Sequence, residues 1–276
     1  MLYLRKTFSY EYPLEEARVS LVGVPWDGTE TGMPVRFGPL FIREAIRNVP
    51  GFDITTKTNP FESLRFADLG DVEVVPGDWK RTREMIEDTV KHILKTNPET
   101  VPVFLGGEHL ITLPVVELLA EFHKGLTVVH LDAHRDLMPE WMGNRYSHIT
   151  WAHHAVSNSF IRLFQFGARS WNKEEEPLIK KVKDRLEEVE GKVYLTVDLD
   201  VLDPSYAPEV GTPEPGGMSP EELLRIVRRV SNMDIVGMDI VECASQRVGT
   251  QTALLAARIF KEMLLGFAEN KGRKQL

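Results

Sequence analysis

Apolar and polar residues alternate along this chain in two different ways. Short runs rich in β-branched apolar residues are separated by longer stretches in which apolar positions recur every three to four residues. The short runs predict buried strands, and the longer stretches predict amphipathic helices. Because this alternation is typical of βα units, we predict an α/β fold with a mainly parallel central sheet.

The same patterns place the individual elements. Strands are expected at 19–24, 64–69, 101–105, 126–131, 161–166, 192–197 and 234–238. Helices are expected at 38–47, 79–95, 110–122, 173–189, 220–230 and 251–269. Ser219, a favoured N-cap residue, is followed by Pro220 at the first helical position, which marks the start of the helix at 220. No linker, repeat or low-complexity block divides the chain, so we expect one domain over residues 1–276.

Composition and charge restrict the class of protein. The 276 residues are 42% hydrophobic and 27% charged, which excludes disordered and fibrous classes. The net charge of −8, without a long basic run, argues against nucleic-acid binding. No stretch reaches the roughly 18 consecutive apolar residues of a spanning helix, and the N-terminal segment scatters charges where a signal peptide has an apolar core. We therefore expect a cytoplasmic protein without a nucleic-acid or membrane partner.

The residues that follow the predicted strands indicate where chemistry takes place. Cys243 is the only cysteine, which excludes an intrachain disulfide and a thiolate zinc cluster, so a metal would need oxygen and imidazole ligands. Such side chains directly follow four predicted strands, in segments 106–109, 132–136, 198–200 and 239–242. Because ligands bind outside the carboxyl ends of strands in parallel α/β sheets, we expect the functional site at this edge.

Two of these segments have the spacing of a metal site. Side chains alternate faces along extended backbone, so Asp132, His134 and Asp136 are expected on one side. Asp198 and Asp200 share a side for the same reason. Carboxylates with a minority of imidazoles suit manganese or a similar divalent ion, and so many anionic oxygens exceed the need of one zinc. The spacing therefore predicts two divalent ions.

His109 completes the candidate ligand set. It follows two glycines that permit a tight turn out of the strand at 101–105. A single acid after a strand often only stabilises a turn, but so many buried carboxylates would repel one another without cations. Glu108 is left out of the ligand set. We interpret His92, His123 and His130 as ordinary histidines without a role in metal binding or catalysis.

Taken together, the motifs resemble the ureohydrolase family, which includes arginases and agmatinases, and most closely its agmatinase branch. The resemblance covers nearly the full length. Its segments are Gly23-Val-Pro-Trp-Asp, Arg36-Phe-Gly-Pro, Ile42-Arg43, Gly-Gly-Glu-His at 106–109, Asp-Ala-His-Arg-Asp at 132–136, Asp198-Leu-Asp-Val-Leu-Asp-Pro, Ala207-Pro208, Gly211-Thr-Pro-Glu-Pro-Gly-Gly217, Glu242 and Thr252-Ala-Leu. It implies a three-layer αβα arginase-like fold and a homo-oligomer, either a trimer or a hexamer.

The resemblance implies two Mn²⁺ ions per chain and assigns a ligand set to each. One ion would be held by His109, Asp132, Asp136 and Asp198, and the other by Asp132, His134, Asp198 and Asp200. Asp132 and Asp198 would therefore bridge the two ions.

The resemblance also assigns catalytic roles. The reaction would cleave a guanidinium into urea and an amine, with a hydroxide as nucleophile. Asp136 would accept and orient the hydroxide proton, and His148 would relay a proton to the leaving amine. Glu242 would pair with the guanidinium through charge-assisted hydrogen bonds.

Three segments depart from the family pattern. Gly-Gly-Asp-His-Ser reads Gly-Gly-Glu-His-Leu at 106–110, and Val-Asn-Pro after the glutamate is replaced by Cys243-Ala-Ser245. The loop from Asp136 to His154 is also unusual in detail. None of these changes removes an expected ligand. We therefore expect an intact metal site, and the departures bear on the substrate.

The expected substrate is agmatine, a small cationic guanidine, with urea and putrescine as products of a polyamine pathway. Ligand carboxylates and hydroxide against two divalent ions leave a local charge of about −1, and Glu242 adds another negative charge, which favours a cation. Glu140 and Trp141 offer contacts for a cationic tail. Arg145 could instead receive a carboxylate, which keeps guanidinobutyrate and arginine open beside aminopropylagmatine and formiminoglutamate.

Two alternatives lie outside this reaction. Deacetylases of related fold also use an Asp/His site, but with one zinc and fewer carboxylates, so the metal count separates them. A non-enzymatic polyamine- or metal-binding protein is the other alternative. The presence of all expected ligands and of both His148 and Glu242 favours the enzyme.

Overall fold

The predicted βα alternation builds one parallel sheet. The computed structural model describes residues 6–8, 11–28 and 32–273, so part of the N-terminal segment considered for a signal peptide lies outside the described residues. The strands are β1 Val19–Val24, β2 Phe66–Asp71, β3 Val101–Gly106, β4 Leu126–Leu131, β5 Ile161–Phe166, β6 Val193–Asp198 and β7 Ile235–Val241. Their order in the seven-stranded sheet is β2-β1-β3-β7-β6-β4-β5, and every neighbouring pair is parallel.

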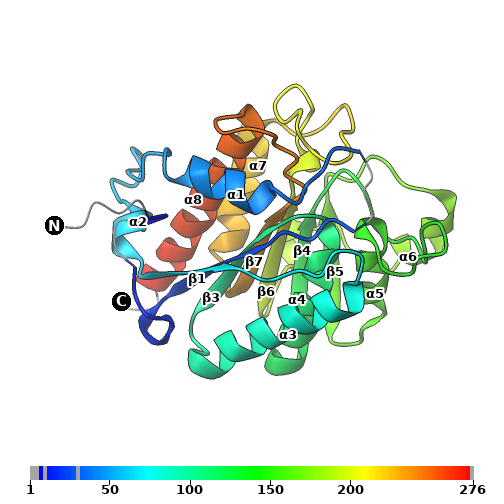
Figure 1. Ribbon diagram of the computed structural model, residues 1–276, viewed down its shortest axis with the longest axis horizontal. Helices are drawn as coiled ribbons and strands as arrows, with labels where there is room; N and C mark the ends of the chain where they lie inside the picture. Colours follow the sequence, from blue (N-terminus) through cyan, green and yellow to red (C-terminus); the bar gives the residue numbers. More distant parts are fainter. Residues whose placement is uncertain (1–5, 9–10, 29–31, 274–276) are drawn as a thin grey trace.

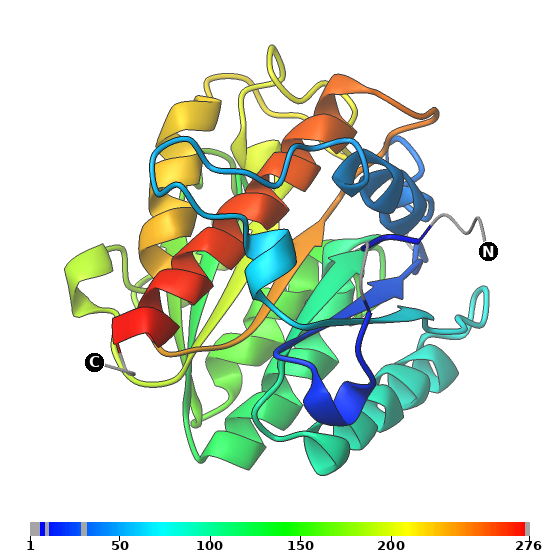
Figure 2. The ribbon, with the colours of Figure 1, turned by 90° about the vertical axis from the view of Figure 1, so that its left-hand side faces the viewer.

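Helices cover both faces of the sheet (Figures 1 and 2). They are α1 Gly38–Ile46, α2 Pro60–Ser63, α3 Trp79–Thr96, α4 Thr112–His123, α5 Trp151–Ser157, α6 Glu176–Ile179, α7 Pro220–Ser231 and α8 Gln251–Arg273. Residues of α1, α7 and α8 form one hydrophobic core with the sheet, and residues of α3, α4 and α5 form the other. This confirms the predicted three-layer α/β arrangement.

Alternation along the strands separates the two cores. In β6, Leu195 and Val197 belong to the core under α7 and α8, whereas Tyr194 belongs to the core under α3 and α4. All six residues of β6 are buried, as is usual for a parallel sheet covered on both faces. The near-continuous apolar runs of the sequence follow from this double burial.

The helix α7 begins at the N-cap residue that the sequence predicts. The Ser219 hydroxyl accepts a hydrogen bond from the N–H of Glu222, and the Glu222 carboxylate accepts the N–H of Ser219 in return. Pro220 occupies the first turn, where its missing N–H has no helical partner to lose. The helix therefore begins where the sequence predicted it.

The helix predicted at 173–189 is wrong. The chain there forms a 3-10 turn at Lys173–Glu175, the short α6, and a second 3-10 turn at Leu186–Glu188. Between these elements, Lys183 pairs with β5: its N–H donates to Leu163 O and its carbonyl accepts from Gln165 N. The backbone N–H and carbonyl of Lys183 are thus hydrogen-bonded to the edge strand β5 and cannot form the bonds of a continuous helix.

The candidate ligand and catalytic residues lie at one edge of the sheet, at the carboxyl ends of four adjacent strands. Strands β3, β7, β6 and β4 are neighbours in the middle of the sheet. Three of the segments singled out in the sequence begin at or directly after the ends of β3, β4 and β6. The fourth was expected to follow a strand ending at 238, but β7 continues to Val241, so residues 239–241 lie within it and only Glu242 follows it. The topology brings the four segments together although they lie far apart in the chain. Among the helices that the structure describes, none is both long and apolar enough to cross a membrane.

Candidate metal and substrate site

His109 stands at the centre of the first group of side chains. It opens the 3-10 turn His109–Ile111 that follows β3, and its ring is buried. Its Nδ1 lies 3.1 Å from Asp132 Oδ2, 3.4 Å from Asp136 Oδ2 and 3.2 Å from Asp198 Oδ2. These four residues are the set expected to hold one ion.

His134 forms a second group beside the first. Its Nδ1 lies 2.9 Å from Asp200 Oδ2 and 3.5 Å from Asp132 Oδ1. Asp132 therefore faces both groups, with Oδ2 toward His109 and Oδ1 toward His134. This is the position that a bridging carboxylate would occupy.

Asp198 and Asp200 are arranged by a local turn. Asp198 ends β6, and its Oδ1 accepts the N–H of Asp200 at 2.8 Å, which starts the 3-10 turn Leu199–Val201. Asp198 Oδ2 remains on the side of His109. The turn places the two carboxylates against different histidines.

The expected ligands lie together, but the alternation of side chains along extended backbone explains their positions only in part. Extended backbone was to place Asp132, His134 and Asp136 on one side, yet Asp136 has a left-handed φ of 56°. Asp200 likewise lies in a 3-10 turn and not in extended backbone. The grouping therefore depends on turns after the strand ends as well as on alternation.

The electrostatics of the cluster favour cations. Burial and the charge of neighbouring Asp132 raise the pKa of Asp136 well above its ordinary value. Burial and repulsion from Asp200 and Asp132 do the same for Asp198. Within the described part of the chain, no Lys or Arg forms an ion pair with these carboxylates. Two divalent ions would supply the missing positive charge, so the donor set fits the expected metal pair.

Three residues that the sequence interpretation missed hold this cluster in place. His130, taken there as an ordinary residue, lies with Nε2 2.6 Å from Asp132 Oδ2. Thr196 Oγ1 lies 2.8 Å from His109 Nε2, which leaves Nδ1 as the ring atom facing the carboxylates. Trp151 Nε1 donates to Asp136 Oδ2 at 2.8 Å.

Glu242 is tied directly to the metal cluster. It follows β7 with a left-handed φ of 64°, and its Oε1 accepts the backbone N–H of His109 at 2.8 Å. Burial and the nearby charge of Glu108 raise the pKa of Glu242 to about 8. A bound guanidinium would favour the ionised carboxylate, because it supplies the opposite charge.

Glu108, which was left out of the ligand set, has a structural role. Its carboxylate accepts the indole N–H of Trp26 at 3.1 Å and the backbone N–H of Gly28 at 2.8 Å. The Glu108 backbone N–H also donates to Trp26 O. Glu108 therefore fixes the chain after β1 against the turn that carries His109.

His148 lies beside the cluster without belonging to it. It opens the 3-10 turn His148–Thr150, which packs against the turn that carries His109. Burial, together with positive charge on His109 and His134, lowers the pKa of His148 to about 4. An imidazole in this environment is neutral at pH 7 and can accept a proton.

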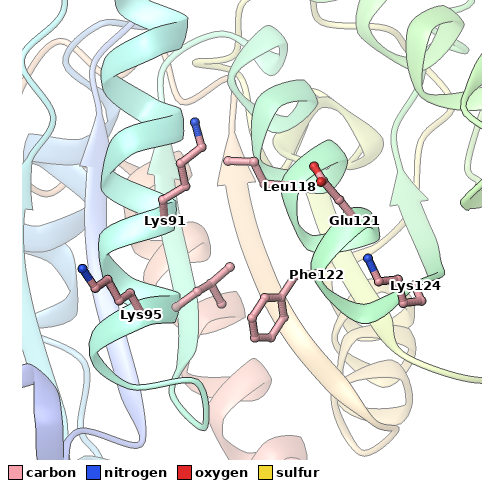
Figure 3. A pocket seen from close by; sticks show the side chains of 7 residues that line it. Lys91, Lys95, Leu118, Glu121, Phe122 and Lys124 are labelled. Atoms are coloured by element: carbon pink, nitrogen blue, oxygen red, sulfur yellow. The ribbon is translucent and has the colours of Figure 1, made fainter.

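A surface hollow of about 450 Å³ lies elsewhere, between α3 and α4 (Figure 3). Its lining includes Lys91, Lys95 and Lys124, near the C-terminal ends of these helices. Because a helix of a βα unit runs antiparallel to its strands, these helix ends lie at the edge of the sheet opposite to the metal cluster. The hollow therefore belongs to a different part of the molecule.

Comparison with known proteins agrees with this site. The chain matches the Arginase family over residues 17–183 and 176–266. It is 36% identical to an N(1)-aminopropylagmatine ureohydrolase from Thermococcus kodakarensis, over 94% of each chain. It is 35% identical to an agmatinase from Bacillus subtilis, over 97% of this chain and 98% of that one. The solved agmatine ureohydrolase of Thermoplasma volcanium superposes with a TM-score of 0.87 at 28% identity, over 99% and 97% of the two chains. The chain therefore belongs to the arginase family and is a ureohydrolase.

Proposed function

We propose that the protein is a binuclear manganese hydrolase that cleaves agmatine into urea and putrescine. The observation that carries this proposal is the link between two groups of residues. A buried cluster of imidazoles and carboxylates, suited to divalent ions, is joined through the His109 N–H to Glu242, a buried carboxylate suited to a guanidinium.

The proposed metal sites start from the two groups described above. One would consist of His109, Asp132, Asp136 and Asp198. The other would consist of Asp132, His134 and Asp200, with Asp198 added as the second bridging carboxylate. In the structure, Asp198 lies against His109 and not against His134. Oxygen donors with a minority of imidazoles suit manganese. Elemental analysis after loading should find two ions per chain, whereas a deacetylase-like site would hold one zinc.

Different residues of the chain orient the nucleophile and transfer the proton in the proposed reaction. Bound manganese would lower the pKa of a water enough to provide hydroxide near neutral pH. In our proposal the Asp136 carboxylate accepts and orients the hydroxide proton, and Trp151 holds that carboxylate in place. The neutral His148 imidazole then takes a proton from solvent water and passes it to the leaving amine.

Glu242 aims the guanidinium in this proposal. Its Oε1 accepts the His109 N–H, and the absence of a side chain at Gly211 leaves room for its Oε2, because an added Cβ would come within 2.4 Å of that oxygen. A carboxylate oriented in this way can hold a planar guanidinium with little loss of entropy on binding. The cation would also relieve the repulsion between Glu242 and Glu108.

The loop before His148 is the proposed contact for the substrate tail. Trp141 and Asn144 exchange backbone hydrogen bonds of 2.7 and 2.8 Å, which closes a tight turn. Residues 142–146 are exposed, and Ser147 and His148 are buried directly after them. The loop thus runs from the surface to the proposed proton relay, and in our proposal the non-reacting end of the substrate lies along it.

The relatives support two related substrates. One is a ureohydrolase of aminopropylagmatine and another is an agmatinase, and both are about equally similar to this chain. Urea release by manganese-loaded protein should be compared for agmatine, aminopropylagmatine, guanidinobutyrate, formiminoglutamate and arginine. We expect the highest kcat/KM for agmatine. A higher value for any of the others would reject agmatine as the substrate and keep the ureohydrolase reaction.

Arg145 provides a matched variant for this comparison. It is exposed in the loop before His148, and its guanidinium could receive a substrate carboxylate. If agmatine is the substrate, Arg145→Ala should leave kcat/KM for agmatine nearly unchanged. A large loss confined to arginine or guanidinobutyrate would show instead that Arg145 recognises a carboxylate-bearing substrate.

Assembly and location remain part of the proposal. We propose a cytoplasmic homo-oligomer, a trimer or a hexamer, in which residues 1–276 form one catalytic domain. Light scattering of the purified chain should give three or six times the mass of the chain. A monomeric mass with full activity would reject the oligomer.

A further inference from the structure

Trp151 contacts the metal cluster directly, which no other described tryptophan does. It is the first residue of α5 and is fully buried. Its Nε1 donates a hydrogen bond of 2.8 Å to Asp136 Oδ2. Its ring also stacks on the ring of His109, with centroids 4.7 Å apart and an interplanar angle of 28°. One side chain therefore touches two expected ligands of the same ion.

The backbone at Asp136 needs support of this kind. Its φ of 56° lies in the left-handed region, which a residue with a side chain adopts at a cost. The N–H of His153, also in α5, donates to the Asp136 carbonyl at 3.1 Å. Because α5 holds Asp136 by its carboxylate and by its carbonyl, the position of this residue is determined by the packing of α5.

The hydrogen bond from Trp151 also sets the rotation of the carboxylate. A carboxylate oxygen can accept in two directions. Asp136 Oδ2 accepts the indole N–H and lies 3.4 Å from His109 Nδ1, so it faces the donor and the metal group together. Without the N–H, the carboxylate could rotate away from His109.

We propose that Trp151 is a positioning residue that fixes Asp136 and His109 in the orientation that binds the first metal ion. This inference rests on the proposed binuclear function. It assigns the effect of the Trp151 N–H to one of the two ions, because this hydrogen bond reaches Asp136, a ligand expected for the first ion only. The Trp151 ring also packs edge-on against His130, with centroids 4.9 Å apart, and His130 Nε2 contacts Asp132. An aromatic ring at position 151 keeps this second contact.

The test is the substitution Trp151→Phe, which keeps an aromatic ring against His109 and removes the N–H. Calorimetric titration of the metal-free protein with Mn²⁺ should show that the ion at His109 binds about 10-fold more weakly or worse, the range for partners that orient metal ligands. Binding at the His134 group should change much less. Thermal unfolding of the metal-free variant checks that it is folded.

Trp79→Phe is the matched control. Trp79 is the first residue of α3, its ring packs against Trp26, and its buried Nε1 has no hydrogen-bond partner. This variant also loses a tryptophan N–H, but no ligand loses a donor. Manganese affinity should therefore equal that of the unaltered protein.

The outcomes separate the inference from the proposed function. Unchanged manganese affinity in Trp151→Phe would overturn the inference alone, and so would equal weakening of both ions together with a lower unfolding temperature, which indicates a purely structural role. No manganese binding by the unaltered protein would overturn the proposed function and this inference with it.

A near-isosteric replacement covers the case in which Trp151→Phe does not fold. β-(3-Benzothienyl)alanine at position 151 keeps the two-ring shape of tryptophan and carries sulfur in place of the N–H. We expect the same weakening of Mn²⁺ binding at His109, with little change at the His134 group. Unchanged affinity in this protein would contradict the inference.

Discussion

The backbone N–H of His109 donates a hydrogen bond of 2.8 Å to Oε1 of Glu242. One contact thus joins a residue of the metal cluster to the residue proposed to hold the substrate. His109 follows β3 and Glu242 follows β7, which are neighbouring strands. The distance between the proposed nucleophile and the guanidinium carbon is therefore determined by the pairing of two central strands and not by a flexible loop.

Glu242→Gln should separate substrate binding from metal binding. The amide oxygen can still accept the His109 N–H, but the negative charge that pairs with the guanidinium is lost. We expect kcat/KM for agmatine to fall about 100-fold, as for removal of one partner of a buried charge pair. Manganese content should stay the same.

Glu117→Gln is the control for this variant. Glu117 pairs with Arg83 on the side of α3 and α4, outside the site, so urea release should be unaffected. Equal kcat/KM in Glu242→Gln and the unaltered protein would show that Glu242 does not bind the guanidinium.

Gly211→Ala should disturb the same carboxylate from its other side. The added Cβ would lie 2.4 Å from Glu242 Oε2, so the carboxylate must move. The moving atom is the end of a side chain, and we therefore expect little change in stability. Misplacement by about 1 Å can cost about 100-fold in rate, so kcat/KM should fall strongly.

Gly216→Ala gives the opposite result if this reasoning holds. Its φ is 81°, which strains any side chain, but an added Cβ meets no atom within 4 Å. We expect a loss of about 1 kcal/mol in the free energy of unfolding and normal kcat/KM. If the two glycine variants had the same effect on kcat/KM, contact with Glu242 would not be the cause.

Strands were easier to predict from the sequence than the helix at 173–189. The strands β1, β4 and β5 have the predicted bounds, because their largely apolar runs are followed directly by Pro25, Asp132 and Gly167, which favour turns. The strand β2 lies two residues further along than predicted, since it forms the sheet edge and its exposed end lacks an apolar pattern. Segment 173–189 has helical composition, but its pairing with β5 through Lys183 depends on tertiary contact.

Some residues of the site could have been predicted from the sequence, and others depend on tertiary contacts. His130 could have been found, because it lies two positions before Asp132 on the same strand face. Trp151 could not, since its hydrogen bond requires the left-handed turn at Asp136 and the packing of α5 against it. Spacing in the sequence therefore predicts which residues gather at strand ends, but not which side chains from later segments support them.

Loss of one carboxylate should affect one or both metal ions according to its position. Asp132 faces both histidines, so Asp132→Ala should abolish binding of both ions. Of the two cluster histidines, Asp200 contacts only His134, so Asp200→Ala should keep the ion at His109. Asp198→Ala should weaken both, if Asp198 bridges as proposed. Elemental analysis of dialysed variants gives the number of ions retained.

Asp203→Ala serves as the control for these variants. Asp203 is only three residues after Asp200, but its carboxylate accepts backbone N–H groups of Ser205 and Gly216 and stabilises a turn. It should keep both ions. Two ions retained in Asp198→Ala would contradict its role as a bridge.

His148→Ala should retain both metal ions and lose turnover. The ring lies beside the cluster, and burial lowers its pKa to about 4, so the neutral form that accepts a proton predominates at pH 7. Removal of a general acid–base group typically costs 10²–10⁴-fold, and we expect a fall of about this size in kcat with little change in KM. Free imidazole should restore part of the rate, because it can enter the space left by the ring and carry the same proton. His123→Ala, at the end of α4 on the opposite edge of the sheet, should behave like the unaltered protein. A normal kcat in His148→Ala at neutral pH would assign the proton relay to another group.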